Sequence, residues 1–204
     1  LDAVTTGDAN VAIGKSALSG NTTGGNNVAI GNQALNAPDT ESNNIAIGSN
    51  ALNGSIAGGE YNVAIGNSAL AALTSSDANV AVGYEAGKAI TGGGDGVVAI
   101  GYQAGVALTD CSSSVFIGYQ AGDGHDEEDH NIAIGRHALG GSVAGAEYNV
   151  AIGSYTLDAL TSGDSNTAVG YNSGSAMNSG GANSCFGESA GASMTSGSNN
   201  TAIG

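Results

Sequence analysis

One stretch of the sequence concentrates residue types that could do chemistry. Residues 123–130 read Asp-Gly-His-Asp-Glu-Glu-Asp-His and replace an ordinary polar bend. Clustered carboxylates are ligands for Ca²⁺, and imidazoles suit transition metals. The spacing differs from that of an EF-hand loop, so a solvated acidic loop is the favoured interpretation and no cofactor is expected. The candidate ligands, should a metal bind, are Asp123, His125, Asp126, Glu127, Glu128, Asp129 and His130.

A second candidate is a set of tyrosines, Tyr84, Tyr102 and Tyr119, which recur at spacings of 17 or 18 residues. Rings repeated at this interval are expected to stack as a ladder. Edged by polar side chains, such a strip could bind a sugar, although self-stacking structure is the favoured reading. Each tyrosine also precedes a glycine by three residues, as Tyr84 precedes Gly87. We hypothesise that the ring covers the surface that a leucine covers in other repeats.

No catalytic residues are predicted, because the sequence has no nucleophile elbow, phosphate loop or paired catalytic groups. Residues 13–18 fit one hexapeptide of a left-handed β-helix acyltransferase, but that fold needs about three per coil. Cys111 and Cys185 occupy different places in the repeat, so free thiols or an intermolecular role are expected in preference to a disulfide between them.

Charge and hydropathy exclude two classes of partner. The formal net charge is −15, and the only fixed cations are Lys15, Lys88 and Arg136. Without a basic stripe, neither nucleic-acid binding nor attraction to anionic lipid is expected. The sequence also has no apolar run of membrane length, so no membrane insertion is expected in this segment.

The element that must position all these residues is a short repeat ending in glycine. Its period is 17 or 18 residues, too short for paired-helix repeats and suited to one coil of a β-solenoid. We predict an all-β parallel β-solenoid, or β-roll, of about twelve coils spanning residues 1–204 as a single array, a segment of a longer chain. The motif glycines are Gly14, Gly31, Gly48, Gly66, Gly83, Gly101, Gly118, Gly135, Gly153, Gly170, Gly187 and Gly204.

Within each repeat, the motif is Asn followed by large, small and large residues, as in Asn62-Val63-Ala64-Ile65-Gly66. The asparagines are predicted to form a ladder along the solenoid. We expect the branched residues to fill the coil and alanine to form a flat outer face, because side chains alternate along a strand. A thin core and an alanine face favour a trimer or another tight assembly. The predicted assembly face is Ala12, Ala29, Ala46, Ala64, Ala81, Ala99, Ala133, Ala151, Ala168 and Ala202.

The strings Asn-Val-Ala-Ile-Gly and Tyr102-Gln103-Ala104-Gly105 resemble the head repeats of YadA-like trimeric autotransporter adhesins. They resemble still more the Thr-Ala-Ile-Gly-Tyr-x-Ala repeats of phage and viral tail fibres. The resemblance covers essentially the whole chain. It implies a parallel β-roll, usually trimeric, carried on a cell surface or virion.

These observations predict a structural and adhesive rod of an extracellular appendage or fibre, without catalysis, that self-associates as a homotrimer. A glycan or protein receptor on a cell surface is a possible partner. One alternative is a filament subunit that polymerises end to end through its open strand edges. A lower alternative is an ice- or surface-binding solenoid, suggested by the column Thr74, Thr91 and Thr109, which Asp39, Asp126 and Val143 interrupt.

Overall fold

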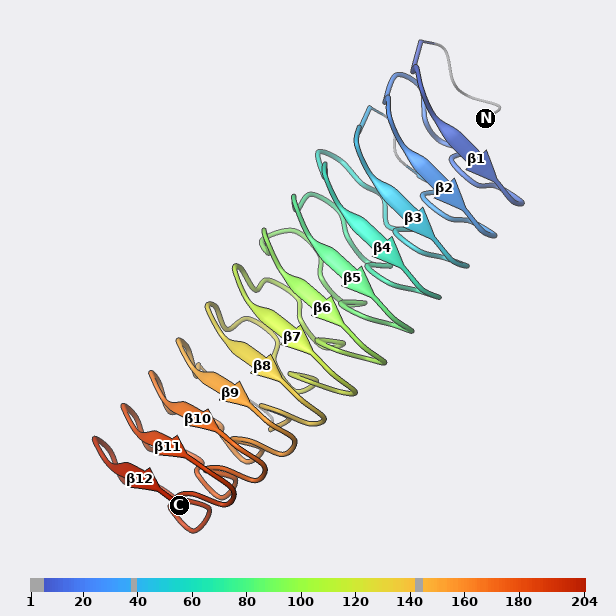
Figure 1. Cartoon of the computed structure of the whole chain (residues 1–204). Helices are drawn as coiled ribbons and strands as arrows, with labels where there is room; N and C mark the ends of the chain where they lie inside the picture. Colours follow the sequence, from blue (N-terminus) through green and yellow to red (C-terminus); the bar gives the residue numbers. More distant parts are fainter. Residues whose placement is uncertain (1–5, 38–39, 142–144) are drawn as a thin grey trace.

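The computed structural model describes residues 6–37, 40–141 and 145–204 and confirms the predicted fold (Figure 1). Twelve three-residue strands stack in chain order into one parallel sheet, with one strand in each turn of a β-solenoid. No helix in this part of the chain is long and apolar enough to cross a membrane. The strands are β1 Val11–Ile13, β2 Val28–Ile30, β3 Ile45–Ile47, β4 Val63–Ile65, β5 Val80–Val82, β6 Val98–Ile100, β7 Val115–Ile117, β8 Ile132–Ile134, β9 Val150–Ile152, β10 Thr167–Val169, β11 Ser184–Phe186 and β12 Thr201–Ile203.

Strand register is the same throughout the sheet. Between β4 and β5, for example, Val63 pairs with Val80 and Ala64 with Ala81. Each motif position therefore forms a column of like residues along the rod. With a rise of about 4.8 Å per strand, the eleven intervals between twelve strands give a sheet about 50 Å long.

The motif glycine is required for two reasons. Gly66 has φ +141°, a backbone conformation that L side chains rarely adopt. A Cβ at this position would also lie 2.1 Å from the carbonyl oxygen of Gly83 in the next turn. Successive corners therefore stack too closely for any side chain.

The coil interior is narrow, and two positions that follow the motif glycine supply large side chains to it. Two turns use both positions, with Leu70 and Leu73 in one and Leu157 and Leu160 in the other. Most turns place a buried leucine four residues after the motif glycine, as at Leu35 and Leu52. Other turns have glycine there and bury a large residue three positions later, as Gly87 is followed by Ile90. A Cβ on Gly87 would lie 3.0 Å from Ile90 Cδ1 and 3.1 Å from Leu70 Cδ2, so these side chains occupy the space.

The hypothesis that tyrosine covers this glycine is therefore wrong. The atoms nearest to Gly87 come from Ile90, Leu70 and Ala81, and Tyr84 is 45% exposed. At Gly105 the space is filled from inside by Leu108. Where glycine replaces the leucine, the space left inside the coil is filled by neighbouring core side chains and not by the tyrosine outside.

The asparagine ladder is confirmed. The Oδ1 atom of Asn62 accepts the backbone N–H of Asn79 in the next turn at 2.9 Å, and its Nδ2 donates to the carbonyl of Ser76 at 2.9 Å. The ladder reaches Val97, whose backbone N–H donates to Asn79 Oδ1. The valine side chain has no oxygen to accept the next N–H, so the ladder is interrupted there. These buried amides satisfy backbone groups that the narrow coil hides from water.

Candidate assembly and ligand-binding surfaces

The outer face of the sheet carries the branched residues, which corrects the predicted orientation of the strands. The central alanines of the inner strands, such as Ala64, are completely buried inside the coil, whereas Val63 and Ile65 are only partly covered. The column from Ala29 to Ala168 therefore cannot be an assembly face, and at the ends Ala12 and Ala202 pack against the same core. The reason is space: the coil is already filled by leucines and their substitutes, so only a methyl group fits beneath the strand.

This outer face, formed by the first and third residues of every strand, is a flat apolar surface. Val and Ile dominate both columns, and neighbours in adjacent strands cover the sides of each side chain. What remains accessible is the outward tip, as at Ile100 and Ile152, which are 36% and 37% exposed. The surface is about 10 Å wide, since a strand rises about 3.3 Å per residue.

An aromatic ladder runs along one side of this face, at the turns that follow the strands. The ring centroids of Tyr84 and Tyr102 are 5.2 Å apart, and those of Tyr102 and Tyr119 are 5.1 Å apart, with nearly parallel planes. The predicted stacking is confirmed. A ligand would meet ring edges and hydroxyls, because the ring faces cover one another, so sugar binding by these tyrosines stays a prediction.

A row of polar side chains accompanies the three tyrosines. Gln120 donates from Nε2 to Gln103 Oε1 at 3.1 Å, and Gln103 donates from Nε2 to Glu85 Oε2 at 2.8 Å. Glu85 also accepts a hydrogen bond from Lys88 Nζ at 2.7 Å. These bonds from Lys88 and Gln103 lower the pKa of Glu85.

The ladder continues beyond the residues that sequence reasoning identified. The His137 ring stands edge-on to Tyr119 at 5.7 Å and stacks on Tyr155 at 5.5 Å. The Arg136 guanidinium lies over the rings of Tyr119 and Tyr155, at 5.4 and 5.8 Å from their centroids. The signal was present in the sequence, because all these residues come one or two places after a motif glycine.

The two histidines of the acidic stretch are held in different places in the structure. His125 is completely buried at the core position where other turns place Ile90, Leu108 or Met177, and its ring packs against Phe116. His130 points elsewhere and stacks on Tyr148 at 5.0 Å. In the described part of the chain, no three His, Cys, Asp or Glu side chains are grouped so that they could hold a metal ion.

Carboxylates of this stretch accept hydrogen bonds from backbone N–H groups. Glu128 is buried, and its Oε1 accepts the N–H of Gly145 in the next turn at 2.9 Å. Burial acts to raise the pKa of Glu128, but hydrogen bonds from Gly145 and Asp126 outweigh it and hold the pKa below its usual value. Five turns earlier Glu41 accepts the N–H of Gly58 in the same way, in a bend without histidine. The shared contact indicates a structural role.

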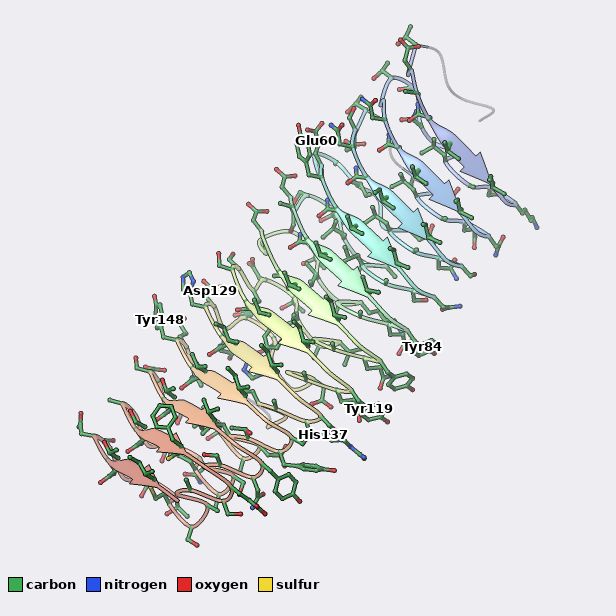
Figure 2. All side chains as sticks on the ribbon, in the orientation of Figure 1. Glu60, Tyr84, Tyr119, Asp129, His137 and Tyr148 are labelled. Atoms are coloured by element: carbon green, nitrogen blue, oxygen red, sulfur yellow. The ribbon has the colours of Figure 1, made fainter. Side chains whose placement is uncertain are left out.

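A second edge of the sheet face lies before the strands, and it is acidic. Figure 2 shows Glu60, Asp129 and Tyr148 on one side of the strands, and Tyr84, Tyr119 and His137 on the other. We call these the amino edge and the carboxyl edge. Six residues before a motif glycine, the amino edge carries a column of carboxylates: Asp8, Glu60, Asp77, Asp95, Asp129, Glu147 and Asp164.

The threonine column also makes hydrogen bonds along the solenoid axis, from one turn to the next. The hydroxyls of Thr74, Thr91 and Thr109 donate to carbonyl oxygens of the next turn at 2.9, 3.2 and 3.0 Å. Asp39 and Val143, two of the residues that interrupt this column, lie outside the described residues. The column therefore has an internal structural role, and ice binding gains no support from it.

Both cysteines are free, as one of the two sequence interpretations expected, and both are buried. Cys111 lies in the core, and burial raises the pKa of its thiol to about 12. Cys185 replaces the central alanine of β11, and burial raises its pKa as well. Neither thiol is placed for an intermolecular disulfide.

Comparison with known protein families, with curated proteins and with solved structures finds no match. The likeness to adhesin heads and tail-fibre repeats rests on the motif alone and stays a prediction.

Proposed function

We propose that this chain is part of a trimeric, non-enzymatic rod of an extracellular appendage or of a viral or phage fibre, with a structural and adhesive role. The observation that carries the proposal is the apolar outer face of the sheet. Its large β-branched side chains point away from the coil, while the coil itself is lined by alanines and, in most turns, only one or two larger side chains. Burying the outer face would complete a hydrophobic core that one chain leaves thin.

The dimensions of the face suit self-association. A strip about 10 Å wide and 50 Å long covers about 500 Å², near the upper end of the apolar patches that monomeric proteins expose. Three such faces around one axis would bring six branched side chains together at every level. The acidic and polar bends would remain in solvent, as expected for a soluble rod with charge −15.

The polar columns support a structural role over a catalytic one. Asparagine, threonine and aspartate side chains recur because they bond to backbone groups of an adjacent turn, as Asn62 and Thr74 bond to the next turn and Asp77 to the preceding one. Adhesion, in this proposal, uses side chains that vary from turn to turn. The aromatic ladder at Tyr84, Tyr102 and Tyr119 is the first place to look for contact with a glycan or a protein receptor.

Molar mass in solution, measured by light scattering, tests the assembly. We expect a trimer that Ile65→Glu weakens, because the new carboxylate would lie on the apolar face. Asn67→Glu is the matched control, since it adds the same charge two residues away at an exposed corner. A folded monomer at all concentrations would overturn the proposal, and large heterogeneous rods would favour the end-to-end filament.

A further inference from the structure

The fixed cations of this chain all lie on one edge of the sheet face, which they share with Glu85 and Glu188, and the opposite edge is purely acidic. All three fixed cations, Lys15, Lys88 and Arg136, lie within five residues after a motif glycine, on the carboxyl edge. The column of seven carboxylates lies on the amino edge. The two edges flank the apolar strands over the whole length of the rod (Figure 2).

A cyclic assembly must bring these unlike edges together. When identical rods surround an axis parallel to their length, with their sheet faces inward, the carboxyl edge of one copy meets the amino edge of the next. The interface is heterologous, so positive and negative groups of one sequence can pair around the ring. This step rests on the trimer proposed above.

Arg136 is the cation best placed for such a contact. It is exposed, and its guanidinium is held between Tyr119 and Tyr155 on the carboxyl edge. The one ion pair among the described residues joins Lys88 to Glu85, so Arg136 has no carboxylate partner among them. In a chain of net charge −15, an arginine fixed in place and left unpaired is suited to an acidic group on a second copy.

Glu147 is the carboxylate best placed to receive it. Arg136 follows β8, and the acidic column at the levels of β8, β9 and β10 presents Asp129, Glu147 and Asp164. Asp129 accepts the backbone N–H of Ser112 at 2.6 Å, and Asp164 accepts that of Glu147 at 3.0 Å. The Glu147 carboxylate makes no hydrogen bond to the described residues of its own chain. It lies about one strand spacing from the level of Arg136, within reach of two long side chains.

We propose that Arg136 of one copy pairs with Glu147 of the next copy around the ring. The pair would also fix the register of one copy against the next along the rod, which the apolar face does not. A repetitive Val and Ile surface packs almost as well after a slip of one turn, whereas a single charge pair favours one register.

The chain supplies its own control for this pair. Glu60 occupies the same position as Glu147 five turns earlier, and its carboxylate likewise makes no hydrogen bond to described residues of its chain. At the levels of β3 and β4, however, the residues after the motif glycines are Ser49 and Asn67, and neither is a cation. Glu60→Lys should therefore leave assembly unchanged where Glu147→Lys weakens it.

The experiment compares trimer association constants by sedimentation equilibrium at low and high salt. An exposed pair contributes about fivefold at most per interface, so across three interfaces Arg136→Glu or Glu147→Lys should lower the constant by up to about a hundredfold at low salt. The loss should shrink near 1 M salt, where the screening length is about 3 Å. The double variant Arg136→Glu with Glu147→Lys should return close to wild type, because every interface regains an opposite pair.

The outcomes separate the two proposals. If the single variants assemble like wild type, or if the double variant does not recover, the edge pair is overturned and the sheet-face trimer stands. If wild type is monomeric, the trimer and the edge pair both fall. Circular dichroism of each variant establishes that the solenoid is folded, so a change in association cannot be mistaken for unfolding.

Discussion

The buried imidazole of His125 gives the sharpest prediction for the fold. The change is His125→Leu, which places a leucine where Leu108 and Leu160 lie in other turns. Both ring nitrogens of His125 are buried without a hydrogen-bond partner of normal geometry. Burial lowers the pKa of His125 to about 4, although the Glu128 carboxylate and the backbone at Leu139 act to raise it.

The sign and size of the effect follow from this shift. The unfolded chain takes up the proton near pH 6.5 and the folded chain only near pH 4, so acidification between these values favours unfolding. At about 1.4 kcal/mol per pH unit, wild type should lose about 3 kcal/mol of unfolding free energy from this residue. The contribution is fully present above pH 6.5 and has been lost by pH 4. His125→Leu should not show this loss and should also be more stable at neutral pH by about 1–2 kcal/mol, because two unpartnered polar atoms are removed.

The assay is chemical unfolding from pH 7 to pH 4 at fixed protein concentration, with amide hydrogen exchange of residues 116–139. The exchange measurement is needed because each turn of a solenoid contacts only its neighbours and can open locally. His130→Leu is the control, since it removes an exposed histidine from the same loop. The acidic residues of the loop are the same in wild type and in both variants. Parallel loss of stability in wild type and His125→Leu would refute the reasoning.

Three further predictions concern the columns of the solenoid. Gly66→Ala should cost at least about 3 kcal/mol or prevent folding, because its Cβ would lie 2.1 Å from the Gly83 carbonyl oxygen. Gly58→Ala, with φ +114° and no atom near its Cβ position, should cost only about 1–2 kcal/mol of backbone strain; equal costs in chemical unfolding would contradict this. Asn62→Ala should cost roughly 3 kcal/mol, because the buried N–H of Asn79 and carbonyl of Ser76 lose their partner, and thermal unfolding within 1 kcal/mol of wild type would count against the ladder. Cys111, with its pKa raised to about 12, should not react with a thiol reagent at pH 8 until denaturant is added; stoichiometric labelling of the folded protein would show that the site is open.

Periodicity in the sequence predicted the solenoid, the asparagine ladder and the tyrosine stack. These features depend on contacts between equivalent residues in successive turns, and a repeat displays such contacts directly. The direction of the strand side chains was predicted wrongly, because alternation shows that Val63 and Ala64 face opposite sides but not which side is inside. That choice depends on how much space the rest of the turn leaves, and Leu70 and Leu73 already fill it.

Phe116 shows how this space is shared among turns. It replaces the central alanine of β7 and points into the coil, where Ala64 has only a methyl group. Its ring fits because Gly122 stands where other turns have leucine: a Cβ on Gly122 would lie 2.0 Å from Phe116 Cδ1. His125 occupies the remaining core position beside the ring. Sequence reasoning treated residues 123–130 as one polar loop and missed this, since the signal lies in the position of His125 relative to Gly118 and not in its acidic neighbours.

The residues that vary from turn to turn indicate what could set the register between neighbouring copies of the rod. Val and Ile dominate both outer columns of the strands, so the apolar face alone cannot distinguish a closed ring from one slipped along its axis. A slipped heterologous interface does not close and would lead to open helical growth. The two edges differ from turn to turn: Glu60 and Glu147 occupy equivalent positions five turns apart, and only Glu147 has an arginine at the neighbouring level. A single charged pair at a fixed level is therefore sufficient, in this proposal, to favour a closed trimer over a growing filament built from the same apolar contacts.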